Sequence, residues 1–456
     1  MAQDRGLTLD QGALYKKLAK IAIPISIQGV VSATLGLIDN LMVGALGEAE
    51  LAAVGIATQI FMIHYMLLFG FVGGTATFMA QFYGTKDYRN IRKVVGFAMT
   101  VAMAAGVVFF VFGFLLTDTV LGIYSSDPAL IALARPYVKI GSITFFFLAV
   151  SVPVEMAFKA TQQTKIPLVV STVVFTTNTC LNYVLIFGKF GAPAMGIAGA
   201  ATATTIARFL EILIMAVFLF RRSNCFRGPV RDFFGWNRDM MTRIIKNATP
   251  TTMNEFFWSL GQSMYVAAFA RIGTTAYAAY QAAAAINSIF SYAAFSIGDA
   301  ALILVGEKLG EGKKDETYVL AKKLLKIGTV FGIIVGVLLI ATAMPLVGLF
   351  NLTELGKVYC FRILLVYGLC MGPSLYNGIN ITGTLRGGGD TRYAMLTEVS
   401  CTWLIAVPLA FLASLVLHMP IYLAVLVVRL EDVAKGILLT KRFISKKWMN
   451  NVITGL

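Results

Sequence analysis

The stretch LGLIDNLMVG, residues 35–44, places a carboxylate, Asp39, at the end of an apolar segment that begins near Ile21. Hydrophobic residues make up 58% of the 456-residue chain and charged residues only 13%, and the mean hydropathy is +0.77. A water-soluble surface is not built from so few charges. The composition therefore predicts an integral membrane protein, in which the charge of Asp39 is costly.

About twelve segments are long and apolar enough to cross a bilayer, which takes roughly 20 helical residues. They lie near residues 18–43, 52–81, 94–117, 133–158, 167–188, 196–220, 244–270, 276–305, 319–346, 358–383, 393–417 and 421–440. Each is about twice as long as the strand of a membrane barrel. We therefore expect an all-α polytopic membrane protein with twelve transmembrane helices.

The net charge of +15 is concentrated in particular connections between these segments. Basic residues precede the first predicted span, follow the second, fourth, sixth and eighth, and recur after the last, whereas the alternate connections hold few. This pattern is typical of membrane orientation and argues against a nucleic-acid partner. We expect a multi-pass protein of the cell membrane with both termini in the cytoplasm.

The longest polar interruption, residues 223–240, divides the predicted spans six and six. An offset of 226 positions aligns the two halves without a gap, pairing Pro24 with Pro250, Gly47 with Gly273, and Gly84 with Gly310. Six spans per repeat keep both copies in the same orientation, so the sequence predicts two six-helix bundles related by pseudo-two-fold symmetry. The expected division is an amino-terminal lobe at 1–222, a cytoplasmic linker at 223–243 and a carboxy-terminal lobe at 244–456.

Three stretches resemble the multidrug and toxic compound extrusion (MATE) transporters. They are LIDNLMVGALGEAELAAVGIATQI at 37–60, LNYVLIFGKFGAPAMGIAGAATATTIAR at 181–208 and GTLRGGGDTR at 383–392. The resemblance covers nearly the whole chain and implies a V-shaped pair of bundles that exports organic, usually cationic, drugs or toxins in exchange for H+ or Na+. A lipid-linked precursor flippase shares this architecture and remains the alternative.

The resemblance also implies a coupling site in the amino-terminal lobe. Asp39 corresponds to the family's first-helix acid. The fifth helix would contribute Asn178 and Asn182, and the sixth would contribute the hydroxyl of Thr204. Several members carry an aspartate where this chain has Asn182, so the site here would hold one carboxylate instead of two.

The residues themselves support such a site. Asn178 and Asn182 are four apart and share a helical face, so their amide oxygens could join Asp39 around a hard cation such as Na+. Burial favours the neutral acid, so Asp39 would also take up a proton readily. Two alternatives stay open: Asp39 faces headgroup water near the outer interface, and the amides merely hold helices together.

A second set of candidates lies on the seventh span and would line the substrate cleft. Glu255 resembles a seventh-helix glutamate of other members, and Asn254 and Trp258 lie close to it in sequence. A deep acid among aromatic rings suits an organic cation through charge and cation–π attraction. The alternative is a structural acid paired to a neighbouring helix. Asp299 and Glu398 are further buried-acid candidates.

Other features are expected to be structural. Arg208 with Glu211, and Arg429 with Asp432, are three residues apart and can neutralise each other. The stretch TLRGGGDTR reads as a flexible cytoplasmic corner.

The sequence offers little support for enzymatic chemistry. It holds two histidines, which does not favour zinc or haem, and no base and nucleophile are grouped at one membrane face. We therefore expect a transporter and no enzyme, with a membrane-embedded transferase as the weakest alternative. No cofactor is expected beyond H+ or Na+ as the coupling ion, and the expected partners are small organic cations and the lipid bilayer, with the chain acting as a monomer.

Overall fold

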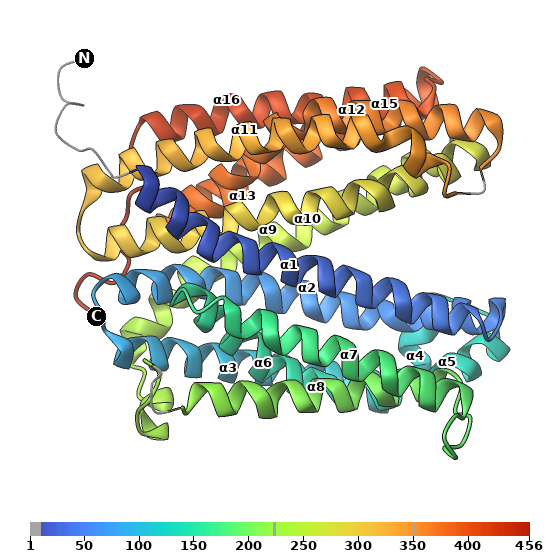
Figure 1. Cartoon of the computed structure of the whole chain (residues 1–456), viewed down its shortest axis with the longest axis horizontal. Coiled ribbons are helices and arrows are strands. Elements are labelled where there is room, and N and C mark those ends of the chain that lie inside the picture. Colours follow the sequence, from blue (N-terminus) through green and yellow to red (C-terminus); the bar gives the residue numbers. More distant parts are fainter. Residues whose placement is uncertain (1–10, 222–224, 351) are drawn as a thin grey trace.

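The computed structural model describes residues 11–221, 225–350 and 352–456, and within these ranges the chain forms helices and loops without a strand. Long helices lie side by side in two groups (Figure 1). The first group consists of α1 (Gln11–Gly44), α2 (Glu48–Gly84), α3 (Tyr88–Phe110), η1 (Val111–Leu115), α4 (Thr117–Gly122), α5 (Pro128–Gly141), α6 (Thr144–Ala160), α7 (Lys165–Phe187) and α8 (Ile197–Leu219).

The second group follows a short 3-10 helix, η2 (Val230–Phe234), in the connection between the bundles. It consists of α9 (Arg238–Ala270), α10 (Thr274–Gly310), α11 (Lys314–Val347), α12 (Glu354–Gly378), η3 (Ile379–Leu385), α13 (Thr391–Cys401), η4 (Thr402–Ala406), α14 (Val407–Phe411), η5 (Leu412–Val416), α15 (Ile421–Val428) and α16 (Leu430–Ile444).

The helices account for the expected spans. In the described ranges nine helices are long and apolar enough to cross a membrane, and α5 with α6, bent by 47°, make a tenth span. α9, and α15 followed by α16, run along the same length of the molecule (Figure 1). The prediction of a polytopic all-α membrane protein with twelve membrane helices in two six-helix bundles is therefore confirmed.

The internal duplication recurs in the helix boundaries. α2 and α10 both have 37 residues, and their bounds are 226 positions apart at each end. α11 also begins 226 positions after α3, and α13 begins 226 positions after α7. The residues before α2 and α10, Gly47 and Gly273, have φ values of 154° and 144°. Only glycine adopts such values without strain, so the same residue starts the same helix twice.

The connection between the bundles lies between α8 and α9. α8 ends at Leu219 and α9 begins at Arg238, inside the range 223–243, and residues 222–224 lie outside the described part of the chain. The connection is attached to the first bundle, because Nε and Nη2 of Arg92 donate to Oδ2 of Asp232 at 3.2 and 2.8 Å. These hydrogen bonds hold the pKa of Asp232 below its usual value.

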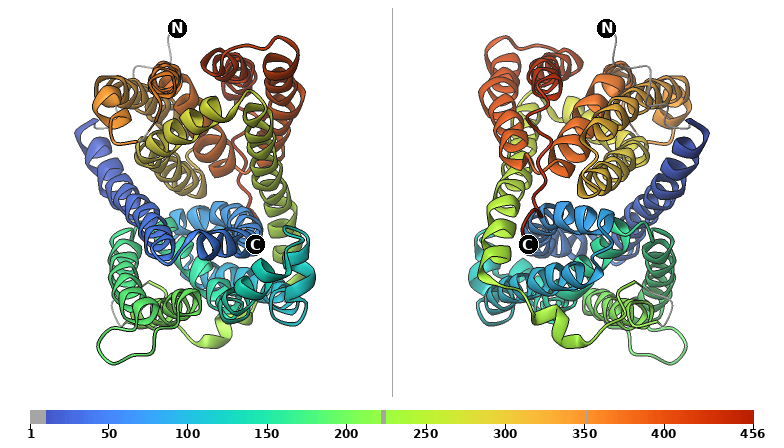
Figure 2. Two further views of the ribbon diagram at one scale, coloured as in Figure 1. Left: turned by 90° about the vertical axis from the view of Figure 1, so that its right-hand side faces the viewer. Right: turned by 90° about the vertical axis from the view of Figure 1, so that its left-hand side faces the viewer.

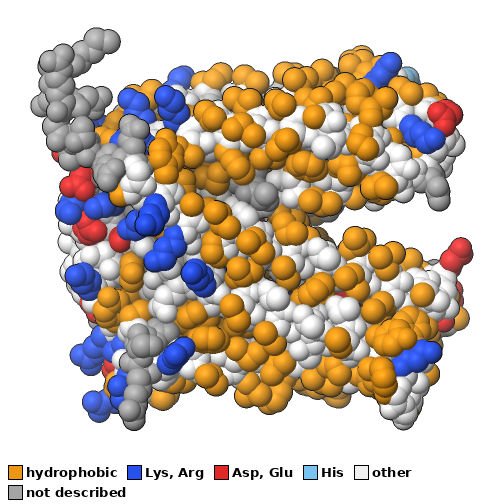
Figure 3. All heavy atoms as spheres, viewed as in Figure 1, with side chains coloured by type: hydrophobic (Ala, Val, Ile, Leu, Met, Phe, Trp, Pro, Cys, Tyr) orange, Lys and Arg blue, Asp and Glu red, His pale blue; other side chains and the backbone are white. Residues whose placement is uncertain are grey.

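The two bundles meet at one end of the molecule and separate at the other. Figure 3 shows a hollow between them at the end away from most of the lysine and arginine side chains. The end-on views show α1 and α9 running along opposite sides of the junction (Figure 2). α1 packs on α10, and α9 packs on α2, so the first helix of each bundle contacts the other bundle.

The closed, basic end depends on two glycines at equivalent positions of the repeat. A Cβ on Gly84 of α2 would collide with the carbonyl oxygen of Glu307, and a Cβ on Gly310 of α10 would collide with that of Gln81. α2 and α10 therefore cross backbone against backbone, as small residues allow helices to do in membranes. Gln81 and Glu307 are themselves 226 positions apart, so the crossing is symmetric.

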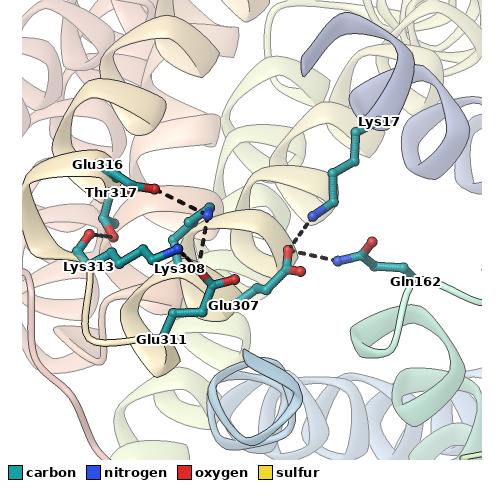
Figure 4. A network of polar contacts seen from close by, with 8 residues as sticks. All are labelled: Lys17, Gln162, Glu307, Lys308, Glu311, Lys313, Glu316 and Thr317. Carbon is teal, nitrogen blue, oxygen red and sulfur yellow. Dashed lines mark hydrogen bonds and ion pairs between the residues drawn. The ribbon is translucent and has the colours of Figure 1, made fainter. Parts of the chain in front are cut away.

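Glu307 ties the bundles together on one side of this crossing. Oε2 of Glu307 accepts from Nζ of Lys17 on α1 at 2.7 Å and from Nε2 of Gln162, in the α6–α7 connection, at 2.8 Å (Figure 4). Neighbouring Lys308 pairs with Glu311 and Glu316 within the second bundle (Figure 4). The polar groups at this end therefore form contacts between the bundles as well as within the second bundle.

Residues 445–456, which we call the strap, also tie the two bundles together at the closed end. Nε2 of Gln81 donates to the carbonyl of Asn450 at 3.0 Å, and its Oε1 accepts from the backbone N–H of Val452 at 2.8 Å. Trp448 is fully buried in the core of the second bundle, whereas Ile453 packs into the core of the first. The strap thus has one anchor in each bundle and lies across the closed end.

We expect Gln81→Leu to loosen the strap, because the leucine keeps most of the side-chain volume but cannot hydrogen-bond. Each bond contributes about 1 kcal/mol, so losing two should speed amide hydrogen exchange over 445–456 roughly tenfold or more. Gln59→Leu is the matched control, since Gln59 lies on the same helix and its side chain donates to the carbonyl of Gly55 one turn earlier. Equal exchange in both variants would show that Gln81 does not hold the strap.

Candidate functional site

The four side chains expected to form the coupling site lie together in the first bundle. Nδ2 of Asn182 on α7 donates to Oδ1 of Asp39 on α1 at 2.5 Å and to Oδ1 of Asn178 at 3.0 Å. Nδ2 of Asn178 in turn donates to Oγ1 of Thr204 on α8 at 3.1 Å. The chain of hydrogen bonds therefore joins three helices that are far apart in sequence.

The surroundings of Asp39 are polar but carry no ion-pair partner. Asn178 is 1% exposed and Asn182 is fully buried, while Asp39 and Thr204 are half-buried. In the described part of the chain, no Lys, Arg or His nitrogen lies within 4.0 Å of the Asp39 carboxylate, and Oδ1 of Asn182 has no hydrogen-bond partner. A carboxylate beside a free amide oxygen is an arrangement that favours a bound cation or proton.

Asp39 lies toward the open end of the molecule. It is five residues from the last residue of α1, Gly44, and α2 starts at Glu48 after a short turn. The nearest guanidinium in electrostatic reach, that of Arg208, is held by Glu211 on its own helix at 2.7 Å, as the spacing of the two residues predicts. Asp39 therefore lies near the open end of the first bundle, and the guanidinium of Arg208 is already paired with Glu211.

The second set of candidates is arranged differently. Nη2 of Arg386 donates to Oε1 of Glu255 at 2.7 Å, and both side chains are largely buried. Nδ2 of Asn254 donates to Oε2 of Glu398 at 2.8 Å, and Trp258 is half-buried one turn further along α9. Glu255 thus has the paired geometry of the structural alternative, with its charge already neutralised.

The glycine-rich stretch around Arg386 is not the flexible corner that its composition suggests. Leu385 and Arg386 are buried, and a Cβ on Gly388 would collide with Trp448 of the strap. The main-chain oxygen of Arg386 accepts from Oγ1 of Thr77 on α2 at 2.7 Å. The glycines are there because backbone and strap approach closely, which glycine spacing alone does not reveal.

Other charged groups lie in the membrane part of the molecule. Lys159 pairs with Glu155 at 2.7 Å on α6, and Glu155 also accepts from Gln28 of α1 at 2.8 Å. Asp299 of α10 has no hydrogen bond or ion pair within the described residues, although Lys159 and Arg386 lie in its electrostatic reach. Asp299 and Glu398 are therefore the rivals of Asp39 for a role in ion coupling.

One cluster had no distinct signal in the sequence. Glu431 and Lys435 of α16 pair at 3.1 Å, with side chains 7% and 6% exposed. Tyr265 of α9 and Thr402 of η4 bond to the same carboxylate. The i,i+4 spacing of Glu431 and Lys435 in a predicted span could have pointed to it. The pair that the sequence did predict nearby, Arg429 with Asp432, is present at 3.6 Å.

Comparison with known proteins matches the MatE family model at residues 24–184 and 250–412. The chain belongs to the MatE family. The two matches begin 226 positions apart, at 24 and 250, which is the offset of the internal repeat.

Curated relatives extend over nearly the same length. A "Probable multidrug resistance protein NorM" from Thermotoga maritima is 25% identical over 96% of this chain and 94% of its own. A "Probable multidrug resistance protein YoeA" from Bacillus subtilis is 26% identical over 88% of this chain and 87% of its own. This MatE protein is therefore a membrane transporter by family.

Solved structures share the fold. One described as an outward-facing conformation of a multidrug resistance MATE family transporter has a TM-score of 0.85, with 17% sequence identity and 95% and 97% of the two chains covered. Another, described as MATE in the bent conformation, also has a TM-score of 0.85, with 17% identity and 95% and 96% covered. At these identities the likeness extends to the fold alone.

The Glu255–Arg386 pair makes a testable prediction for stability. Glu255→Gln should leave a buried guanidinium without its counter-charge, and breaking such a pair costs about 3 kcal/mol. The double variant Glu255→Gln/Arg386→Gln should recover most of that loss, because no unpaired charge remains. Thermal unfolding of the purified variants in detergent measures both effects. If the double variant is no more stable than Glu255→Gln, the pair does not neutralise itself as the geometry indicates.

Proposed function

We propose that this MatE protein is a secondary active antiporter that exports organic cations in exchange for H+ or Na+. The observation that carries the proposal is the hydrogen-bonded cluster of Asp39, Asn182, Asn178 and Thr204, whose one carboxylate has no cationic partner among the described residues. An antiporter needs a group whose charge changes with ion occupancy, and this carboxylate is such a group. The names of the curated relatives, multidrug resistance proteins, support drugs or toxins as the exported class.

The shape of the molecule supports an alternating-access cycle. The basic end is the cytoplasmic end by the positive-inside rule, so the hollow in Figure 3 faces outward. In this cycle the substrate enters from the cytoplasm, the bundles rock about their junction, and the substrate leaves through the outer hollow. An ion captured at Asp39 from outside drives that release, because a ligand shifts a conformational equilibrium only by its differential affinity for the two states.

The residues present fit a coupling ion of either kind. Na+ takes oxygen ligands, and the cluster offers the Asp39 carboxylate, the free amide oxygen of Asn182 and the hydroxyl of Thr204. A proton needs the carboxylate alone. The two ions are therefore distinguished by the amides: Asn182→Ala should weaken coupling nearly as much as loss of the acid if the ion is Na+, and less if it is H+.

Asp39→Asn should abolish gradient-driven export, because the amide keeps the size of the side chain and much of its hydrogen bonding but cannot change charge. We expect accumulation of a fluorescent organic cation in proteoliposomes to fall at least roughly tenfold, with substrate binding largely retained. Asp299→Asn and Glu398→Gln are the matched controls, since both remove an acid of the membrane part without touching the cluster. The proposal fails if Asp39→Asn transports at the wild-type rate, or if only a control variant is uncoupled.

A further inference from the structure

The second bundle holds a polar cluster of its own, and one member of that cluster lies at the repeat position of Asp39. The offset of 226 positions pairs Asp39 of α1 with Tyr265 of α9. The hydroxyls of Tyr265 and Thr402 donate to the same oxygen, Oε2 of Glu431, at 3.5 and 3.2 Å. These residues belong to α9, η4 and α16, whose order in the second bundle matches that of α1, α7 and α8 in the first.

The two clusters differ in the countercharge of their carboxylate. In the second bundle Nζ of Lys435 lies 3.1 Å from Oε2 of Glu431, four residues earlier on the same helix. In the first bundle the described residues place no ammonium or guanidinium within 4.0 Å of Asp39, and its carboxylate accepts from an amide. One cluster therefore contains its own cation and the other does not.

This difference has a simple electrostatic meaning. A carboxylate inside the membrane part must be neutralised, by a proton, a metal ion or a cationic side chain. An ammonium carries the same single charge as Na+ and brings three hydrogen-bond donors to surrounding oxygens. Oε2 of Glu431 contacts Nζ of Lys435, and the hydroxyls of Thr402 and Tyr265 donate to that same oxygen.

We propose that Lys435 is a tethered cation: its ammonium fills, at the Glu431 cluster, the position that the free coupling ion takes at the Asp39 cluster. The Glu431 cluster then binds no ion from solution, and the protein exchanges ions through the first bundle alone. The comparison between the two clusters rests on the proposed role of Asp39 as the site of the coupling ion. Removing the ammonium should turn the Glu431 cluster into a new site for a proton or a small monovalent cation.

Other groups face Lys435 and have to be separated from Glu431. Asp432 accepts from Ser374 at 2.7 Å and has Arg429 at 3.6 Å, so its charge is already balanced. Glu398 of α13 lies in electrostatic reach of Lys435 and accepts from Asn254. Oδ1 of Asn254, a residue 2% exposed, has no partner in the described part of the chain and would be available to an incoming cation.

The test measures ion-dependent stability of purified protein, which requires no transport. Asp39→Asn serves as the background because it silences the first site. Melting temperatures are compared in sodium chloride against choline chloride, and at mildly acidic against mildly alkaline pH. We expect no ion dependence to be gained in Asp39→Asn alone. Adding Lys435→Met should make sodium or protons raise the melting temperature by roughly 2 °C or more, because the ion neutralises the unpaired charge of Glu431.

Two further variants fix the interpretation. Lys435→Arg keeps a cation on Glu431 and should behave as the background, whereas adding Glu431→Gln to Lys435→Met should abolish the gained dependence. A folded Lys435→Met protein that gains no ion dependence would overturn the proposal and assign the cluster to packing. An ion dependence that survives Glu431→Gln would also overturn it and assign the gained dependence to Glu398. If instead Asp39→Asn leaves the wild-type ion dependence unchanged, the proposed role of Asp39 fails while the effect of Lys435 is still measured.

Discussion

The constraint on which the structure depends is that a charge inside a membrane must be neutralised within the protein. Most charges of the spans obey it through a neighbour on the same or an adjacent helix, as Lys159 does with Glu155 and Arg386 with Glu255. Asp39 is surrounded by neutral amides and a hydroxyl instead. Asp299 is a second exception, with no ion pair in the described part of the chain, but only Asp39 lies in a cluster of polar side chains, and the proposed function depends on that cluster.

The same constraint relates the proposed coupling site to the closed end of the molecule. The closed end consists of a backbone crossing at Gly84 and Gly310, with Gln81 and Glu307 providing polar ties across it. Such ties are modest in energy, since each hydrogen bond contributes about 1 kcal/mol. An ion that neutralises Asp39 can be worth as much. In the proposed cycle, ion occupancy at Asp39 therefore acts against individual ties of this size at the closed end.

Much of the fold could be predicted because the lengths of the apolar segments and the internal repeat can both be read directly from the sequence. The offset of 226 positions anticipates helix boundaries to the residue for α2 and α10. The cluster around Asp39 was also predictable, since Asn178 and Asn182 share a helical face and the resemblance supplied the partner helices. The structure brings the four residues together, while their role in coupling stays a prediction.

The remainder could not be predicted because it depends on contacts between segments far apart in the chain. The partner of Glu255 is Arg386, 131 positions away in a stretch that reads as a flexible loop. The strap is polar and follows the last span, and nothing in its composition shows that Trp448 and Ile453 anchor in different bundles. At Glu431 the spacing to Lys435 is visible in the sequence, but the hydroxyls of Tyr265 and Thr402 are brought to it only by the fold.

Under the proposed function, ion occupancy at Asp39 sets the separation of the bundles at the open end. Spin labels at Phe190, in the α7–α8 connection, and Leu355, at the start of α12, are exposed and lie on different bundles. The labels are attached to cysteines introduced at these two positions of an otherwise cysteine-free protein. Pulsed electron paramagnetic resonance measures the distance between them as pH and sodium concentration are varied. The account predicts a distance distribution that shifts with the ion in the wild-type sequence and stays fixed in Asp39→Asn. A shift of equal size in both proteins would contradict it.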